Sequence, residues 1–199
     1  MHRHALITLL EGQLDGGFLD PDLVARFLAF VRAHDDCLLR TCEVGHITAS
    51  AWIWSEDETS CLLTHHRKLD RWLQLGGHVD GEPDVQFAAL REAQEESGMQ
   101  RFQLLAPAGV LVPLDLDVHP IPQRKDEKEH LHWDVRFLLR AEPGQDLVVS
   151  SESNALRWVA RRELPQFVTE ESVVRLERCA ASWQKQNGQM ALRACPLFR

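Results

Sequence analysis

Three glutamates fall on one face of a predicted helix. Glu92 lies three residues before Glu95 and four residues before Glu96, so a helix through this segment brings the three carboxylates together. Like charges at these spacings destabilise a helix by roughly 0.2–0.5 kcal/mol per pair. Glu95 and Glu96 also lie in the last turn, where the helix dipole favours cations. A helix selected for stability alone would not carry this arrangement.

A divalent cation would remove this electrostatic conflict. Mg²⁺ and Mn²⁺ take oxygen ligands, and Mg²⁺ is typically bound by one or two carboxylates, water and a substrate phosphate. The pair Gly76-Gly77 precedes the helix and lets the backbone approach a ligand closely. Arg91 can pair with Glu95 one turn later, or with an acid before the helix. The alternative to a metal site is a solvated acidic helix face, which is common.

The elements around these residues follow from the periodicity of the apolar positions. We expect the acidic helix to run from about Asp84 to Ser97 and to end at Gly98, with Phe87 and Leu90 entering the core. Alternation with a period of two predicts strands, at 45–54, 60–64, 72–75, 110–118, 131–139 and 156–159. Helical spacing predicts two more helices, one after the N-cap pair Asp20-Pro21 and one at 170–186. This mixture predicts an α/β fold with a mixed sheet between helices.

The chain has room for one ordinary domain and an extension. Its 199 residues are 44% hydrophobic and 26% charged, as in globular proteins. We expect a helical N-terminal extension at 1–42, a main domain at 43–188 and a C-terminal tail at 189–199. The extension could shape the site or form a homodimer.

Charge and cysteine content exclude several classes of function. The chain has 30 acidic residues against 22 Lys and Arg, which argues against a broad surface for DNA, RNA or an anionic membrane. No stretch approaches the roughly 20 apolar residues that span a membrane, and the apolar run Ala5–Leu10 is too short for an export signal.

The five cysteines are odd in number and contain no Cys-x-x-Cys pair. We therefore expect a reducing, cytoplasmic location.

A second group of polar side chains lies on two predicted strands. Alternate positions place on one face Asp115, Asp117 and His119 of the first strand, and His130, His132, Asp134 and Arg136 of the second. If the strands pair, these residues could form an additional metal site or a substrate-binding wall, while cross-strand hydrogen bonding is the simpler expectation. The loop between them, 119–129, is long enough for a lid and could supply a carboxylate from Glu127 or Glu129.

A basic stretch lies between the second and third predicted strands. It contains His65-His66-Arg67-Lys68 and Arg71 in a generally acidic chain. Beside a metal–diphosphate site these side chains could bind phosphates, and a solvated hairpin end is the alternative. The substrate-binding candidates of the whole chain are Arg67, Arg71, His78, His130 and His132.

The acidic helix and the segment before it resemble a known signature. Gly76-Gly77, a short acidic turn, and then Arg91-Glu92-x-x-Glu95-Glu96-x-Gly98 are similar to the signature of the Nudix hydrolases. The resemblance implies a Nudix-type α/β/α sandwich and hydrolysis of a phosphoanhydride in a nucleoside diphosphate linked to another moiety. It implies a small nucleotide or diphosphate as the substrate.

The same resemblance implies roles for individual residues. The carbonyl of Gly76 and the carboxylates of Glu92, Glu95 and Glu96 would bind Mg²⁺ or Mn²⁺. A metal-activated water would attack phosphorus, with Glu92, Glu95 and Arg91 as the catalytic residues. The number of metal ions and the identity of the general base stay open, because some members of the family take the base from a loop outside the signature.

One position departs from the family pattern. The family has a glutamate eight residues before the arginine, and this chain has Pro83 there. Either Glu82, one residue earlier, or Asp80 could support Arg91 instead.

Two other functions remain alternatives. A ligand-binding sensor would use the same fold without hydrolysis. An isomerase of isoprenoid diphosphates would need a catalytic cysteine, for which Cys61 is the central candidate.

Overall fold

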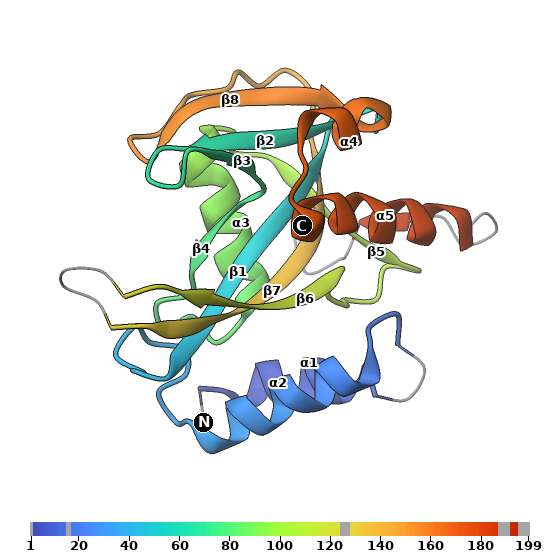
Figure 1. Cartoon of the computed structure of the whole chain (residues 1–199). Coiled ribbons are helices and arrows are strands. Elements are labelled where there is room, and N and C mark those ends of the chain that lie inside the picture. The colour runs from blue at the N-terminus through green and yellow to red at the C-terminus, as the bar shows by residue number, and fades with distance from the viewer. Residues whose placement is uncertain (1, 15–16, 124–127, 187–191, 195–199) are drawn as a thin grey trace.

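The computed structural model describes residues 2–14, 17–123, 128–186 and 192–194 (Figure 1). Its helices are α1 (His4–Glu11), α2 (Pro21–Ala33), α3 (Val85–Ser97), α4 (Leu164–Phe167) and α5 (Glu171–Gln186). Its strands are β1 (Gly45–Trp54), β2 (Ser60–His66), β3 (Arg71–Leu73), β4 (Leu75–His78), β5 (Phe102–Pro107), β6 (Asp115–Ile121), β7 (His130–Ala141), β8 (Ser153–Ala160) and β9 (Leu192–Ala194). No helix in the described ranges is both long and apolar enough to cross a membrane.

The sheet is mixed, and β1 and β7 form its centre. These two strands run parallel, from Gly45 opposite Leu131 to Trp54 opposite Arg140. The other pairings of the described strands are antiparallel, with β4 also bonded to β1, β6 to β7 and β8 to β2. β4 and β7 therefore flank the same stretch of β1, which brings residues far apart in the sequence to one end of the sheet.

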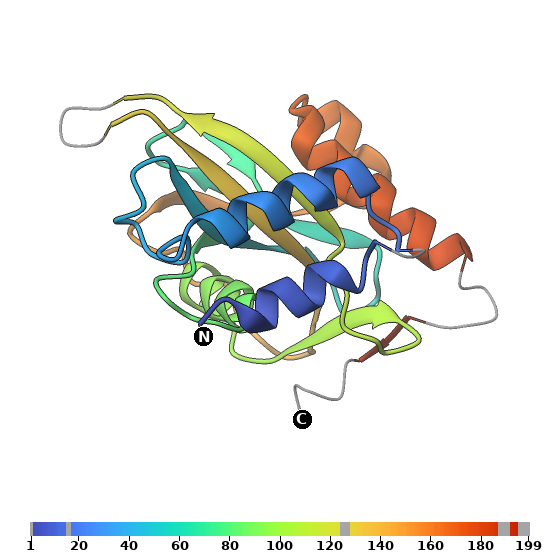
Figure 2. The same ribbon diagram turned by 90° about the horizontal axis from the view of Figure 1, so that it is seen from below.

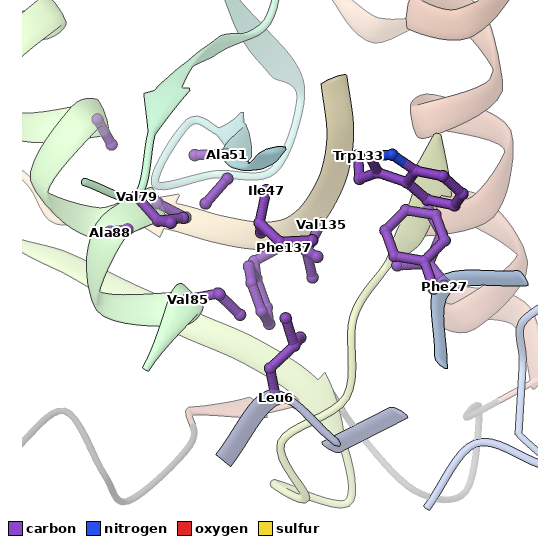
Figure 3. Close-up of a cluster of buried hydrophobic side chains, with 14 of the residues drawn as sticks. Leu6, Phe27, Ile47, Ala51, Val79, Val85, Ala88, Trp133, Val135 and Phe137 are labelled. Atoms are coloured by element: carbon purple, nitrogen blue, oxygen red, sulfur yellow. The ribbon is translucent and has the colours of Figure 1, made fainter. Parts of the chain in front are cut away.

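One face of the sheet is covered by α1, α2 and α3. Ile47 of β1 and Val135 and Phe137 of β7 pack into a buried cluster with side chains of these helices (Figure 3). Phe27 of α2 meets Trp133 edge-on, with ring centroids 5.1 Å apart. Figure 2 shows the two N-terminal helices lying across this part of the sheet. The segment predicted as an extension thus shares the main core, and its boundary at residue 42 stays a prediction.

The opposite face of the sheet packs on α5. Trp52 and Trp54 of β1 are fully buried there, in a second cluster with Val173 and Leu176 of the helix. Both indole N–H groups donate to Glu177 Oε2, each over 3.0 Å. Helices on both faces of a mixed sheet confirm the predicted fold class.

Two expectations about the elements are wrong. The strand predicted at 110–118 begins only at Asp115 and continues to Ile121. Residues 110–114 instead connect it to β5, a strand that the pattern did not predict and that ends in a turn through Ala108 and Gly109 with positive φ. Phe87 is 40% exposed rather than in the core. α3 instead packs on the sheet through Val85 and several alanines, whose small side chains allow a close approach.

Most other elements match their predictions. Asp20 caps α2 by accepting the N–H of Asp22 over 3.0 Å, and Gly98 ends α3 in the left-handed conformation. The strand expected at 72–75 is split into β3 and β4.

Candidate active site

The glycine pair of β4 brings the backbone against the acidic helix. Gly76 pairs with Ser50 and Gly77 with Ala49 of β1. A Cβ atom on Gly76 would overlap Ser50, and one on Gly77 would lie 2.5 Å from Glu92 Oε2. Only glycine at these two positions therefore lets β4 pair with β1 and at the same time lie against the carboxylates of α3.

Glu96 is the most buried of the three helix glutamates, with 6% of its surface exposed. The backbone N–H of Gly76 donates to Glu96 Oε2 over 3.0 Å. Burial, with smaller contributions from the charges of Glu92, Glu152 and Glu95, raises the pKa of the Glu96 carboxyl to about 8 despite this hydrogen bond. The carboxylate is thus held at the glycine pair among other carboxylates, where burial disfavours its charge.

Arg91 joins the helix to the end of β4. Its Nη2 donates to the carbonyl of His78 over 2.6 Å and to Glu92 Oε1 over 2.9 Å. Arg91 Nε lies 3.9 Å from Glu95 Oε1, so the expected contact one turn later is present but long. Burial raises the pKa of Glu92, and the charges of Glu95 and Glu152 add to the shift while Arg91 opposes it. Arg91 therefore orients the Glu92 carboxylate.

The two acids considered as supports for Arg91 have other partners. Glu82 Oε1 accepts the N–H of Asp84 over 3.1 Å, at the start of α3. Asp80 is held by Arg40, whose Nε and Nη2 donate to its two oxygens over 2.7 and 2.8 Å. Among the described residues Arg91 is therefore oriented by the His78 carbonyl and Glu92, while the turn before the helix is tied to the N-terminal segment.

A fourth acid near the helix was missed by the sequence analysis. The negative charge of Glu152, in the turn before β8, contributes to the raised pKa of both Glu92 and Glu96. The carbonyl of Glu152 accepts the backbone N–H of Arg67 over 3.0 Å. No sequence spacing connects residue 152 with the helix, because only the pairing of β8 with β2 places the turn there.

The two basic candidates are held differently. The Arg67 side chain donates to the carbonyl of Ser153 over 3.0 Å, so it lies at the turn that carries Glu152. Arg71 lies with its Nε 3.8 Å from Glu170 Oε1, just before α5. The structure brings Arg67, and not Arg71, next to the fourth acid.

β6 and β7 pair, as the expected polar face required, and a buried arginine organises that face. Arg136 is 1% exposed and donates to Asp134 over 2.8 Å, to Asp115 over 3.1 Å and to Asp117 over 3.0 Å. Arg175 of α5 adds a second positive charge to Asp115 and Asp117. This part of the face is the cross-strand hydrogen bonding that we expected as the simpler outcome.

Histidines fill the remaining end of that face. His130 and His132 of β7 lie beside His78 of β4 and beside His46 of β1, which the sequence analysis did not single out. His119 pairs with His132 across the β6–β7 register. Of the loop candidates, Glu127 lies outside the described residues, and Glu129 is exposed.

The cysteine required by the isomerase alternative is not available at the site. Cys61 is fully buried in the cluster under α5. Burial raises the pKa of its thiol to about 12, which disfavours the thiolate.

A mixed sheet between helices, with a glycine pair set against an Arg-Glu-x-x-Glu-Glu helix, defines the class of protein. The sequence model of the NUDIX domain matches residues 45–177, and the chain belongs to this family. The family resemblance of the acidic helix is thereby confirmed.

Individual relatives agree with this assignment. The chain is 32% identical over 96 residues to a "Probable DHNTP pyrophosphohydrolase" of Lactococcus lactis, a match that covers 48% of this chain and 54% of the relative. The chain thus matches about half the length of this curated relative.

Solved structures show the same fold. A NUDIX-family hydrolase of Clostridium perfringens superposes with a TM-score of 0.51 at 24% identity, over 69% of this chain and 97% of that one. An Ap4A hydrolase of C. elegans superposes with a TM-score of 0.52 at 17% identity, over 70% and 98%.

Proposed function

We propose that the protein is a pyrophosphohydrolase that uses Mg²⁺ or Mn²⁺ to cleave a phosphoanhydride bond in a nucleoside diphosphate derivative. The observation that carries this proposal is the position of Glu92 and Glu96 against the backbone of Gly76-Gly77, with the charges of Glu95 and Glu152 acting on them. Membership of the Nudix family and the name of the Lactococcus lactis relative support it.

The residues at the glycine pair fit a hard divalent cation. Burial raises the pKa values of Glu92 and Glu96, and the charges of Glu95 and Glu152 add to both shifts, so a bound cation would relieve both effects. We assign the ligands to Glu92, Glu95, Glu96 and the carbonyl of Gly76. When bound, the metal supplies Lewis-acid polarisation of phosphate oxygens and lowers the pKa of a bound water.

The protein side chains then have separable tasks. Arg91 keeps the Glu92 carboxylate in place through its two hydrogen bonds. Glu92, Glu95 and Glu152 are the candidates for accepting the proton of the attacking water, and Glu152 is a candidate from outside the signature. Arg67, at the same turn, would bind the phosphates of the substrate.

The substrate is a small nucleotide or diphosphate, and neither DNA nor a membrane is a partner. Because of the relative's name, DHNTP is the first compound to test as a substrate. Diadenosine nucleotides and sugar nucleotides are tested next. We propose a cytoplasmic location, since Cys37, Cys42, Cys61 and Cys179 are free thiols in the structure. A homodimer through the N-terminal segment stays a prediction.

The experiment is to measure product release from this panel with Mg²⁺, with Mn²⁺ and with chelator. The purified wild type is compared with Glu92→Gln and with Glu163→Gln, a surface control that leaves the acidic helix intact. We expect metal-dependent turnover of at least one compound, reduced at least 100-fold in Glu92→Gln alone. Metal binding without turnover of any compound would favour the sensor, and equal turnover in both variants would contradict the assigned site.

A further inference from the structure

The histidines at one end of the sheet converge on a common point. His46 of β1 lies directly opposite His132 in the parallel β1–β7 register, and His130 lies two residues before His132 on the same face. Ligating nitrogens of these three side chains all lie within 4.8 Å of one another. His46 and His130 are buried, with 3% and 6% of their surfaces exposed.

A fourth imidazole completes the group. His78 of β4 has its ring centroid 4.9 Å from that of His46 and 5.0 Å from that of His132. The His46 centroid is also 4.8 Å from that of His130 and 4.9 Å from that of His132. Three strands that are remote in sequence thus place four imidazoles around one centre.

We propose that His46, His130 and His132, with His78 as the fourth ligand, form a binding site for a transition-metal dication of the zinc class. Imidazole nitrogen suits Zn²⁺, Co²⁺, Ni²⁺ and Cu²⁺, whereas Mg²⁺ requires oxygen ligands. Tetrahedral zinc with nitrogen ligands needs nitrogens about 3.3 Å apart, so the side chains, whose ligating nitrogens now lie within 4.8 Å of one another, would have to draw closer on binding.

The hydrogen bonding of the cluster supports a metal. The Nε2 atoms of His78 and His132 are buried without a hydrogen-bond partner in the part of the chain that the structure describes. Buried nitrogens of this kind are costly unless a ligand engages them. His130 Nδ1 donates to the carbonyl of Lys128 over 2.8 Å, and this hydrogen bond orients the ring beside His46 and His132.

This site is separate from the acidic helix. Gly77 faces Glu92 of α3, and His78, the next residue of the strand, points to the other face of the sheet. The two sites would select different ions, because the oxygen ligands at the acidic helix suit Mg²⁺ and the nitrogen ligands of the histidines suit zinc. A metal held by histidines of β1, β4 and β7 would also fix the end of β4 to which Arg91 is bonded. The proposal does not depend on the proposed hydrolase function.

The test is Co²⁺ and Zn²⁺ binding to the full chain after chelator treatment, read by the visible absorption of Co²⁺ and by calorimetry. We expect one Co²⁺ with the intense spectrum of tetrahedral nitrogen ligation, displaced by Zn²⁺ but not by millimolar Mg²⁺. His132→Gln should weaken Zn²⁺ binding at least tenfold. His34→Gln, which removes a histidine outside the cluster, should leave it unchanged.

Two results would overturn the proposal. One is Co²⁺ binding that Glu96→Gln abolishes and His132→Gln does not, because the ion would then lie at the carboxylates. The other is X-ray absorption of the zinc-loaded wild type that shows oxygen ligands only. The second measurement uses no variant, so it decides the matter even where a histidine substitution prevents folding.

Discussion

Gly76 donates its backbone N–H to Glu96 Oε2 over 3.0 Å, and this bond joins β4 to the last turn of α3. The helix dipole disfavours a carboxylate at that end of the helix, and burial disfavours its charge. The hydrogen bond offsets part of both costs. The part of these costs that the hydrogen bond does not offset makes the ionised form of Glu96 unfavourable in the metal-free protein.

The pH dependence of stability should report the raised pKa of Glu96. The folded state keeps a proton up to about pH 8, whereas the unfolded state releases it near the ordinary value of 4.5. The free energy of unfolding of the metal-free protein therefore falls as pH rises between these values, by on the order of 2–4 kcal/mol from this group. Urea unfolding at pH 5.5 and at pH 8.5, both with chelator, measures this difference in the free energy of unfolding. Glu96→Gln should lose less stability over this range, and equal losses in variant and wild type would refute the account.

Gly77→Ala should damage the site without unfolding the protein. The added Cβ would lie 2.5 Å from Glu92 Oε2, so the carboxylate must move while the helix stays. We expect at least a tenfold loss of metal-dependent hydrolysis and a change in thermal midpoint of no more than about 2–3 °C. Gly12→Ala is the matched control, because its added Cβ meets only ordinary contacts at 3.6 Å. Wild-type activity in Gly77→Ala would remove Glu92 from the mechanism.

Arg136→Met should be strongly destabilising. The substitution leaves Asp115, Asp117 and Asp134 without the guanidinium that bridges them, and Arg136 itself is 1% exposed. Removing one partner of a buried ion cluster typically costs about 3–5 kcal/mol. Arg178→Met removes an exposed ion pair with Glu171 and should cost less than about 1 kcal/mol. Chemical denaturation measures the free energy of unfolding of both variants. Similar losses in the two variants would show that the buried network contributes little to stability.

Phe27→Ala tests whether the N-terminal helices belong to the main core. Phe27 is fully buried against Trp133 of β7, and truncating such a side chain costs about 3–5 kcal/mol. Phe18→Ala, at a side chain that is 47% exposed, should cost about 1 kcal/mol. A loss confined to a separate early transition in calorimetry would instead mean that the segment folds independently.

The sequence predicted the acidic helix well because the information is local. Gly98 ends α3 where expected, and the spacing of Glu92, Glu95 and Glu96 needs only helical geometry. Alternation along each strand also placed the polar residues of β6 and of β7 on one face, although the pairing of the two strands was only a condition.

The parts that were missed depend on the tertiary structure. Glu152 approaches the helix only through the pairing of β8 with β2, and His46 joins the other histidines only through the parallel register of β1 and β7. Phe87 was misplaced because a large apolar side chain was expected inside, whereas α3 packs through alanines. Local periodicity carries no information on which strands become neighbours.

Divalent-metal binding at α3 is the central claim, and Mn²⁺ binding measured by electron paramagnetic resonance tests it most directly, since it requires no knowledge of the substrate. Wild type, Glu96→Gln and Glu163→Gln are titrated with Mn²⁺, with Mg²⁺ as the competitor. The account predicts Mn²⁺ binding that Mg²⁺ displaces, weakened at least tenfold in Glu96→Gln and unchanged in Glu163→Gln. Equal affinity in all three proteins, or no binding to the wild type, would contradict it.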